Sequence, residues 1–400
     1  MSNNNKGEQG PLKGIRVIEL GQLIAGPFCG QLLADLGAEV IKIELPGKGD
    51  PMRDWGRKLP VWWSIIARNK KCITLDVRTD KGRAIIKELV TKSDIVLENF
   101  RPGTMEKWGL GYEVLSKINP AIIMVRVSGY GQNGPYSSRA GYGGIGEAMG
   151  GLRYVVGDPS TPPSRVGISI GDSLAAMFAC IGALAALHHR QQTGHGQIVD
   201  SAIYEAVLGV MESTIPEFTV ANFIRERTGS ILPGLAPSNI YPTKDEQMIL
   251  IGANQDTVFK RLCEAMNRKE LAEDERYQTH HARGNNQKEL DDLISEWTEK
   301  FDTDALLALL EKHGVPAGKI FRAPDMLADP HYRERRTIIE VEHAEYNNLK
   351  MQNVFPRFSE TPGKVNWPGP AVGEHNEEIY KNLLNYDEEK IGSLKEEGVI

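Results

Sequence analysis

Residues 15–44 read IRVIELGQLIAGPFCGQLLADLGAEVIKIE and contain two apolar runs separated by a turn and a helical segment. The first run, Ile15–Leu20, predicts a strand, and the turn Gly21–Pro27 leads into a helix over Phe28–Leu36. The second run, Glu39–Glu44, predicts another strand. A strand, a helix and a strand within about 30 residues form a βαβ unit, which predicts a parallel sheet.

The same alternation continues along the first third of the chain. Strands are predicted at Cys72–Asp76, Ile95–Glu98 and Ile122–Ser128, with helices at Lys81–Thr91 and Tyr112–Lys117. This pattern predicts an α/β fold with an open, Rossmann-like parallel sheet and helices on both faces. Residues 129–171 look rich in loops, and an apolar helix is expected from Asp172 to about His189.

The composition changes near residue 226. Residues 241–251 predict a hairpin, residues 255–311 are charged and helical, and Ala317–Ile320 predicts a strand. We therefore expect a large domain in residues 1–225, a smaller α+β domain in 226–328, and a C-terminal part, 329–400, that returns to the large domain.

Composition excludes several classes of protein. With 40% hydrophobic and 25% charged residues, the chain is neither disordered nor fibrous. A net charge of −6 disfavours nucleic acid as a partner. The four cysteines are far apart in sequence, which argues against zinc or a disulfide framework. The polar stretch Met1–Gly10 predicts no signal peptide, and Leu174–Leu187 is shorter than a membrane span of about 20 residues. These features indicate a cytoplasmic protein without a membrane segment.

Two glycine motifs match the dinucleotide fingerprint without its context. Gly129–Gly134 follows a strand, but Pro135 and two serines come next instead of a helix, and no clear strand precedes Gly141–Gly146. The glycines favour tight turns, and a nicotinamide dehydrogenase is disfavoured. No nucleotide-triphosphate loop is present, and the nine histidines form no metal-binding pattern.

Two groups of charged residues have both a structural and a functional interpretation. Asp172 precedes an apolar helix, so it is either an N-cap or a carboxylate nucleophile kept ionised by the helix dipole. The basic run Arg68–Lys71 is either a solvated charged surface or a phosphate-binding element.

An ordered series of segments resembles the family III CoA-transferases, which include formyl-CoA, carnitine-CoA and succinyl-CoA:dicarboxylate transferases. The segments lie at residues 12–27, 36–44, 68–76, 94–103, 128–135, 167–173, 192–197, 315–320 and 353–363. The resemblance covers essentially the whole chain. It implies a homodimer of two interlocked subunits, with the smaller domain inserted into the larger one.

The resemblance assigns Asp172, in GISIGD (167–172), as the nucleophile. It implies attack on an acyl-CoA thioester, a mixed anhydride, an aspartyl-CoA thioester, a second anhydride and the new acyl-CoA. The acyl-CoA is then a substrate, with no tightly bound cofactor and no metal. We expect succinyl-CoA as donor and a small carboxylic acid as acceptor. Water must be excluded, because every intermediate hydrolyses.

The resemblance also implies binding residues. Those for CoA are Leu23, Ile24, Ala25, Asn69, Lys70, Asn99, Phe100, Arg101, Lys107 and Tyr130, and those of a substrate loop are Gly252, Asn254 and Gln255. Leu45 stands where formyl-CoA transferase has a basic residue, which Lys48 or Arg68 replaces in our interpretation. Ile24 stands where that enzyme has Gln, so formate is disfavoured. Three arginines are candidates to hold a distal carboxylate: Arg139, Arg153 and Arg165.

Two alternatives remain within CoA chemistry. An α-methylacyl-CoA racemase needs a His acid/base where this chain has Tyr142, so proton transfer lacks its partner. A CoA-binding protein without catalysis is the other alternative.

Overall fold

A computed structural model describes residues 10–400. The polar stretch that predicts no signal peptide lies outside the described residues, apart from Gly10. The chain divides into two compact units. The first contains residues up to 152, 166–213 and 334–400, and the second contains 153–165 and 214–333.

The second unit begins earlier in the chain than the change in composition at residue 226. Segment 153–165 belongs to it because hydrogen bonds join this segment to the chain near residue 226. The Tyr154 hydroxyl donates to Glu226 Oε1 at 2.7 Å, and the Gly229 N–H donates to the Gly157 carbonyl at 3.0 Å. Contacts between distant segments, which composition does not reveal, therefore set this boundary.

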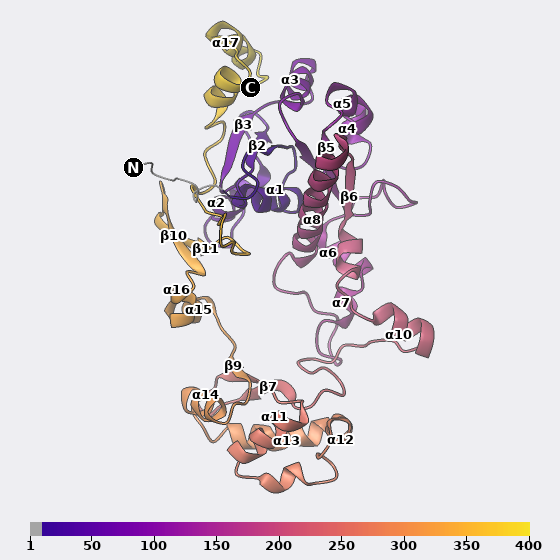
Figure 1. The fold of residues 1–400 in the computed structure, drawn as a ribbon, viewed down its shortest axis with the longest axis vertical. Coiled ribbons are helices and arrows are strands. Elements are labelled where there is room, and N and C mark those ends of the chain that lie inside the picture. The colour runs from indigo at the N-terminus through magenta and orange to yellow at the C-terminus, as the bar shows by residue number, and fades with distance from the viewer. Residues whose placement is uncertain (1–9) are drawn as a thin grey trace. The chain divides into compact units, whose positions relative to one another are not determined.

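A six-stranded parallel sheet forms the centre of the first unit (Figure 1). Its order is β3-β2-β1-β4-β5-β6. The strands are β1 (Arg16–Glu19), β2 (Glu39–Glu44), β3 (Lys70–Thr74), β4 (Ile95–Glu98), β5 (Ile123–Ser128) and β6 (Ile198–Ala202). The predicted α/β class and parallel sheet are confirmed. The main shift is in β3, which begins two residues earlier than predicted.

Alternate strand residues face opposite layers of helices. Val17 and Val40 pack with α1 (Ala25–Asp35) and α8 (Ile170–Thr193) on one face. On the other face, Ile18 and Ile41 pack with the remaining layer. That layer contains α3 (Asp80–Val90), α5 (Tyr112–Ile118), η3 (Glu378–Leu383) and α17 (Glu388–Glu396). Burial on both faces explains why most of the uncharged strand residues are apolar.

Residues 129–171 are more ordered than their glycine content predicts. They contain α6 (Gly143–Met149) and α7 (Leu152–Val155). The apolar helix α8 begins at Ile170 and extends to Thr193, beyond both predicted limits. Within residues 10–400, α8 alone has the length and hydropathy of a membrane span, but half of its apolar window is buried. It packs on α1, α9 (Ile203–Leu208), β5 and β6 as a core helix.

The second unit has its own core. The predicted hairpin is confirmed as β7 (Ser238–Pro242) and β8 (Met248–Gly252), and β9 (Ala317–Lys319) pairs with β8. Helices cover this sheet: α11 (Asp256–Ala265), α12 (His280–Asn285), α13 (Gln287–Thr298) and α14 (Thr303–Lys312). The unit also contains α10 (Thr214–Ala221), η2 (Lys269–Ala272), α15 (Ala323–Ala328) and most of α16 (Pro330–Glu334).

The first unit has five further short elements. They are η1 (Pro51–Asp54), α2 (Trp62–Ile66), α4 (Thr104–Lys107) and the hairpin of β10 (Ile338–His343) and β11 (Asn347–Gln352).

Candidate active site

The loops after β1 and β4 meet where the strand order reverses. β1 pairs with β2 on one side and with β4 on the other. The connection that follows β1 and the connection that follows β4 therefore lead toward opposite ends of the sheet. Asn99, just after β4, receives a hydrogen bond from the Gln22 N–H at 2.7 Å and donates to the Gln22 carbonyl at 2.9 Å. Ligands of open parallel sheets bind at this reversal, outside the carboxyl ends of the strands.

Helices α1 and α8 pack against each other on one face of the sheet. Ala25, at the start of α1, and Leu174, near the start of α8, belong to one hydrophobic cluster. The direction of α8 is fixed at both ends. The Ser201 hydroxyl, near the end of β6, donates to the Ala175 carbonyl at 2.9 Å, and Arg190 binds Asp94, just before β4, at 2.8 Å. Asp172 therefore lies at the carboxyl edge of the sheet.

Asp172 is not the N-cap of α8. The cap residue is Ser169, which makes no side-chain capping bond, and Asp172 is the third residue of the helix. The N-cap interpretation is wrong because the helix starts two residues earlier than predicted. Its half-buried carboxylate faces Gly143, the first residue of α6. A Cβ on Gly143 would lie 2.7 Å from Asp172 Cγ, so this glycine leaves the space that the carboxylate occupies.

A cavity of about 140 Å³ lies at the carboxyl ends of β1, β2 and β3. The predicted CoA residue Phe100 lines it and packs edge-on against Trp108, with ring centroids 5.0 Å apart. The cavity lining is Leu20, Gln22, Ile43, Glu44, Leu45, Leu75, Asp76, Val77, Arg78, Phe100 and Trp108.

The cavity contains Leu45 and, beside it, a cation that the sequence interpretation missed. The Arg78 guanidinium binds Asp76 through two hydrogen bonds, Nε to Oδ1 at 2.8 Å and Nη2 to Oδ2 at 2.7 Å. Hydrogen bonding with Arg78 lowers the pKa of Asp76. Arg78 thus lines the same cavity as Leu45, with its charge paired to Asp76. Its position four residues after β3 is the signal that could have found it.

The basic run Arg68–Lys71, at the start of β3, is largely paired with carboxylates and is not part of this cavity. Arg68 is buried against Asp35, with Nη2 2.6 Å from Oδ2, so it does not replace the basic residue expected at Leu45. Lys71 binds Glu39 at 2.5 Å and Glu378 at 2.6 Å. The carboxylates that pair with these cations come from other elements, which the sequence of the run does not show.

The polar atoms of Asn69 and Lys70 are taken up by protein partners, although the Lys70 ammonium lies beneath the first turn of α1, next to the predicted CoA turn. The Asn69 amide donates to Asp35 Oδ1 at 2.9 Å and accepts from the Asn366 N–H at 2.7 Å. Lys70 is fully buried on Glu19, with the two charged atoms 2.7 Å apart. Both residues stand at the amino end of β3, whereas the residues after β3 reach the cavity.

The remaining predicted CoA residues follow strands at the carboxyl edge. Leu23, Ile24 and Ala25 form the turn into α1, and Leu23 has a positive φ of 63°. The cations Arg101 and Lys107 are exposed after β4. Tyr130 follows β5, and its ring packs on Tyr136 and Tyr204.

The predicted substrate loop belongs to the second unit. Gly252 ends β8, and Gln255 is the N-cap residue of α11. The Asn254 carbonyl accepts a hydrogen bond from Arg283 Nη2 at 2.7 Å. Their role toward the substrate stays a prediction, as does that of the arginines Arg139, Arg153 and Arg165.

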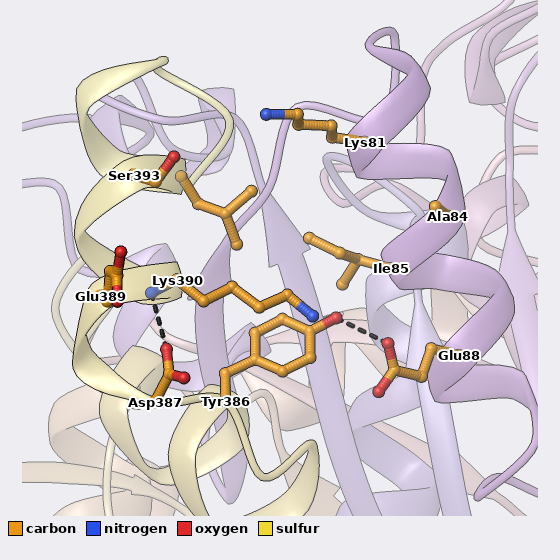
Figure 2. Close-up of a pocket in the computed structure, with 10 residues that line it drawn as sticks. Lys81, Ala84, Ile85, Glu88, Tyr386, Asp387, Glu389, Lys390 and Ser393 are labelled. Carbon is orange, nitrogen blue, oxygen red and sulfur yellow. Dashed lines mark hydrogen bonds between the residues drawn. The ribbon is translucent and has the colours of Figure 1, made fainter.

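A larger cavity, of about 530 Å³, separates α3 from α17 and lies outside this group of residues (Figure 2). The Tyr386 hydroxyl donates to Glu88 at 2.6 Å, and the Lys390 ammonium lies 3.3 Å from the centre of the Tyr386 ring. Lys81 pairs with Glu397. These contacts hold α17 against α3. We therefore interpret the cavity as a gap in the packing of these two helices and not as a substrate site. Within residues 10–400, no group of three or more His, Cys, Asp or Glu is placed to hold a metal.

The chain belongs to CoA-transferase family III, whose model matches residues 12–376. It is thus an enzyme of the CoA-transferase class. Among its relatives is succinyl-CoA–D-citramalate CoA-transferase of Chloroflexus aurantiacus, 58% identical over 98% of both chains. Human succinyl-CoA:glutarate CoA-transferase is 33% identical over 98% of this chain and 90% of that one. The crystal structure of a CAIB/BAIF family protein from Brucella suis matches with a TM-score of 0.85, at 35% identity, over 94% of this chain and 100% of that chain. These relatives do not favour the racemase alternative.

Proposed function

We propose that the enzyme transfers CoA from succinyl-CoA to a small dicarboxylate, such as a hydroxylated C4–C5 diacid. The relative that is 58% identical acts on succinyl-CoA and D-citramalate by its name, and it supports both halves of this proposal. The observation that carries the chemistry is the Asp172 carboxylate at the start of α8, on the same sheet edge as the CoA turn.

The proposed reaction has four acyl-transfer steps. Asp172 attacks the thioester carbonyl, the C–S bond breaks, and CoA thiolate leaves an aspartyl-succinyl anhydride. The thiolate then attacks the aspartyl carbonyl and releases succinate, which leaves an aspartyl-CoA thioester. The acceptor carboxylate displaces the thiolate to form a second anhydride. The thiolate finally attacks the acceptor's carbonyl and regenerates Asp172. No step needs an oxidant or ATP.

Backbone N–H groups are the proposed stabilisers of the tetrahedral oxyanions. The first turn of a helix has N–H groups without intrahelical acceptors, and α8 has no side-chain cap at Ser169. The helix dipole also favours negative charge there. The start of α8 thus supports both the ionised nucleophile and the developing oxyanion.

Mass spectrometry tests the proposal directly. The protein is incubated with succinyl-CoA and a panel of carboxylic acids, and new thioesters are followed with time. We expect transfer in the wild type and none above background for Asp172→Ala. Hydroxylamine added during turnover should modify Asp172 alone, as shown by peptide mapping. Full transfer by Asp172→Ala, or an unlabelled Asp172 while product accumulates, would show that the nucleophile is wrong.

We also infer that two copies of the chain form a homodimer in the cytoplasm. One face of α8 exposes large apolar side chains in the single chain, including Met177, Phe178, Ile181 and Leu184. A contiguous apolar surface of this kind is typical of an interface. All four cysteines are buried free thiols, which is compatible with a reducing compartment.

A further inference from the structure

A buried cluster of four charged side chains lies beneath the turn that follows β1. Its members are Glu19, Lys42, Asp50 and Lys70, each at most 2% exposed. Lys42 Nζ is 2.7 Å from Asp50 Oδ2 and 3.5 Å from Glu19 Oε1, and Lys70 completes the cluster on Glu19. The two positive and the two negative charges of the cluster therefore cancel.

Helix α1 packs closely over this cluster. A Cβ on Gly30 would lie 2.9 Å from the Glu19 carboxyl carbon and 3.3 Å from Lys70 Nζ. Lys70 also donates to the Pro27 carbonyl, in the first turn of α1, at 2.7 Å. The cluster is thus fixed to the helix that the turn enters.

Two members of the cluster hold the turn itself. Lys42 Nζ donates to the Gly21 carbonyl. Asp50 Oδ1 accepts from the Leu23 N–H at 3.2 Å and from the Met52 N–H at 2.9 Å. Leu23 has the left-handed φ of 63°, a conformation that a leucine adopts only when its surroundings impose it.

The opposite side of the turn is held by Asn99. Its side-chain amide binds both the N–H and the carbonyl of Gln22. The turn is therefore held at three successive residues: Lys42 binds Gly21, Asn99 binds Gln22, and Asp50 binds Leu23. Each of these hydrogen bonds goes to a backbone atom of the turn, so together they fix the backbone conformation. The side chains of Leu23 and Ile24 take no part in them.

Stability alone is a weak reason for such a cluster. Burying ion pairs costs desolvation, and apolar residues of similar size often stabilise a protein as well or better. Burial acts to lower the pKa of Lys42, but Asp50, Glu19 and Glu44 outweigh it and raise that pKa. Burial acts to raise the pKa of Asp50, but Lys42 and the N–H bonds hold it below the ordinary value. Both groups stay charged at neutral pH.

We propose that Lys42 and Asp50 are positioning residues, which hold the turn Gly21–Ala25 in the shape that receives the CoA thioester. This inference rests on the proposed function and adds residues that touch neither substrate. Because the turn is predicted to contact acyl-CoA and not the acceptor, loss of the pair should weaken acyl-CoA binding selectively.

The test compares two substitutions at Asp50 with a matched control. Asp50→Asn keeps an acceptor for Leu23 but points an amide at Lys42, and Asp50→Ser keeps the cap of η1 while removing the carboxylate. The control is Asp387→Asn. Asp387 is the N-cap of α17 and accepts the backbone N–H of Lys390 at 2.8 Å, but it lies at the cavity between α3 and α17, outside the candidate site.

We expect the Kd for CoA, measured by calorimetry, and the KM for succinyl-CoA to rise about tenfold in both Asp50 variants. The KM for the acceptor acid should stay unchanged, and Asp387→Asn should change none of these constants. Hydrogen exchange of intact wild-type protein gives a second readout. The Leu23 amide should be protected without ligand and should exchange faster in each Asp50 variant that folds.

Two results would overturn the inference. One is CoA affinity within twofold of wild type in the folded Asp50 variants. The other is rapid exchange of the Leu23 amide in the wild type, which remains decisive if neither variant folds. A wild-type protein that neither binds CoA nor transfers it would instead refute the proposed function, while the exchange of Leu23 would still report on the turn.

Discussion

Gly143→Ala should inactivate the enzyme without unfolding it. A Cβ at this position would lie 2.7 Å from Asp172 Cγ and 3.1 Å from Oδ1, whereas ordinary contacts begin at 3.4 Å. The carboxylate would have to move by about 1 Å, and a displacement of this size at a reacting group costs about 100-fold in rate. That loss corresponds to about 2.7 kcal/mol of transition-state stabilisation.

Stability should change far less than activity. Gly143 is the first residue of α6, so the gain in helix propensity from alanine is below the about 1 kcal/mol of a helix interior, and the contact with Asp172 offsets it. The assay is kcat for transfer from succinyl-CoA, together with Tm. A suitable control is Gly392→Ala in α17, where a Cβ would meet nothing within 4 Å. A Gly143→Ala enzyme within threefold of wild-type kcat, with an unchanged Tm, would refute the geometric argument.

Three further predictions concern stability, thiol reactivity and assembly. The lowered pKa of Asp50 means that its charge stabilises the fold fully above the ordinary value of 3.8, and that this contribution is lost as pH falls through the lower folded value. Asp50→Asn should therefore lower the free energy of unfolding, measured in urea at pH 7, by about 3 kcal/mol. The difference in unfolding free energy between this variant and the wild type should become smaller below pH 3.8. Burial raises the pKa of Cys180 to about 11 and that of Cys263 to about 12. Iodoacetamide at pH 8 should thus label them, by mass spectrometry, only after unfolding; rapid labelling of the native protein would contradict this. Ile181→Glu on α8 should give a monomer in sedimentation, whereas Val114→Glu on α5 should leave the mass of a dimer; an unchanged mass for Ile181→Glu would exclude α8 from the interface.

The sheet could be predicted from the sequence because its signals are local. Glu39–Glu44 and Ile95–Glu98 have the predicted limits, since their β-branched and aliphatic residues lie between turn signals that are close in the sequence. The helix α6 was missed because Gly143 and Gly146 lower its intrinsic propensity. Its glycines permit close packing, which is a tertiary property.

Apart from Asp172 at the start of α8, the sequence placed candidate residues at this edge only where they follow strands. Asn99 and Phe100 come directly after β4 and reach the carboxyl edge as expected. Asn69 and Lys70 come at the start of β3, and their polar atoms bind Asp35 and Glu19. A basic run looks the same in a sequence whether its partners are phosphates or buried carboxylates, so only the fold separates the two.

The order of strands in the sheet also constrains how the molecule can acquire activity. Gln22 and Asn99 are 77 residues apart, yet their loops are joined through neighbouring strands. During synthesis β2 and β3 emerge before β4, so the backbone N–H and C=O groups on one edge of β1 stay unpaired until β4 is made. Such an edge attracts other chains, and closing so long a loop is slow. After denaturation, helical circular dichroism should return before CoA binding, and refolding yield should fall as protein concentration rises.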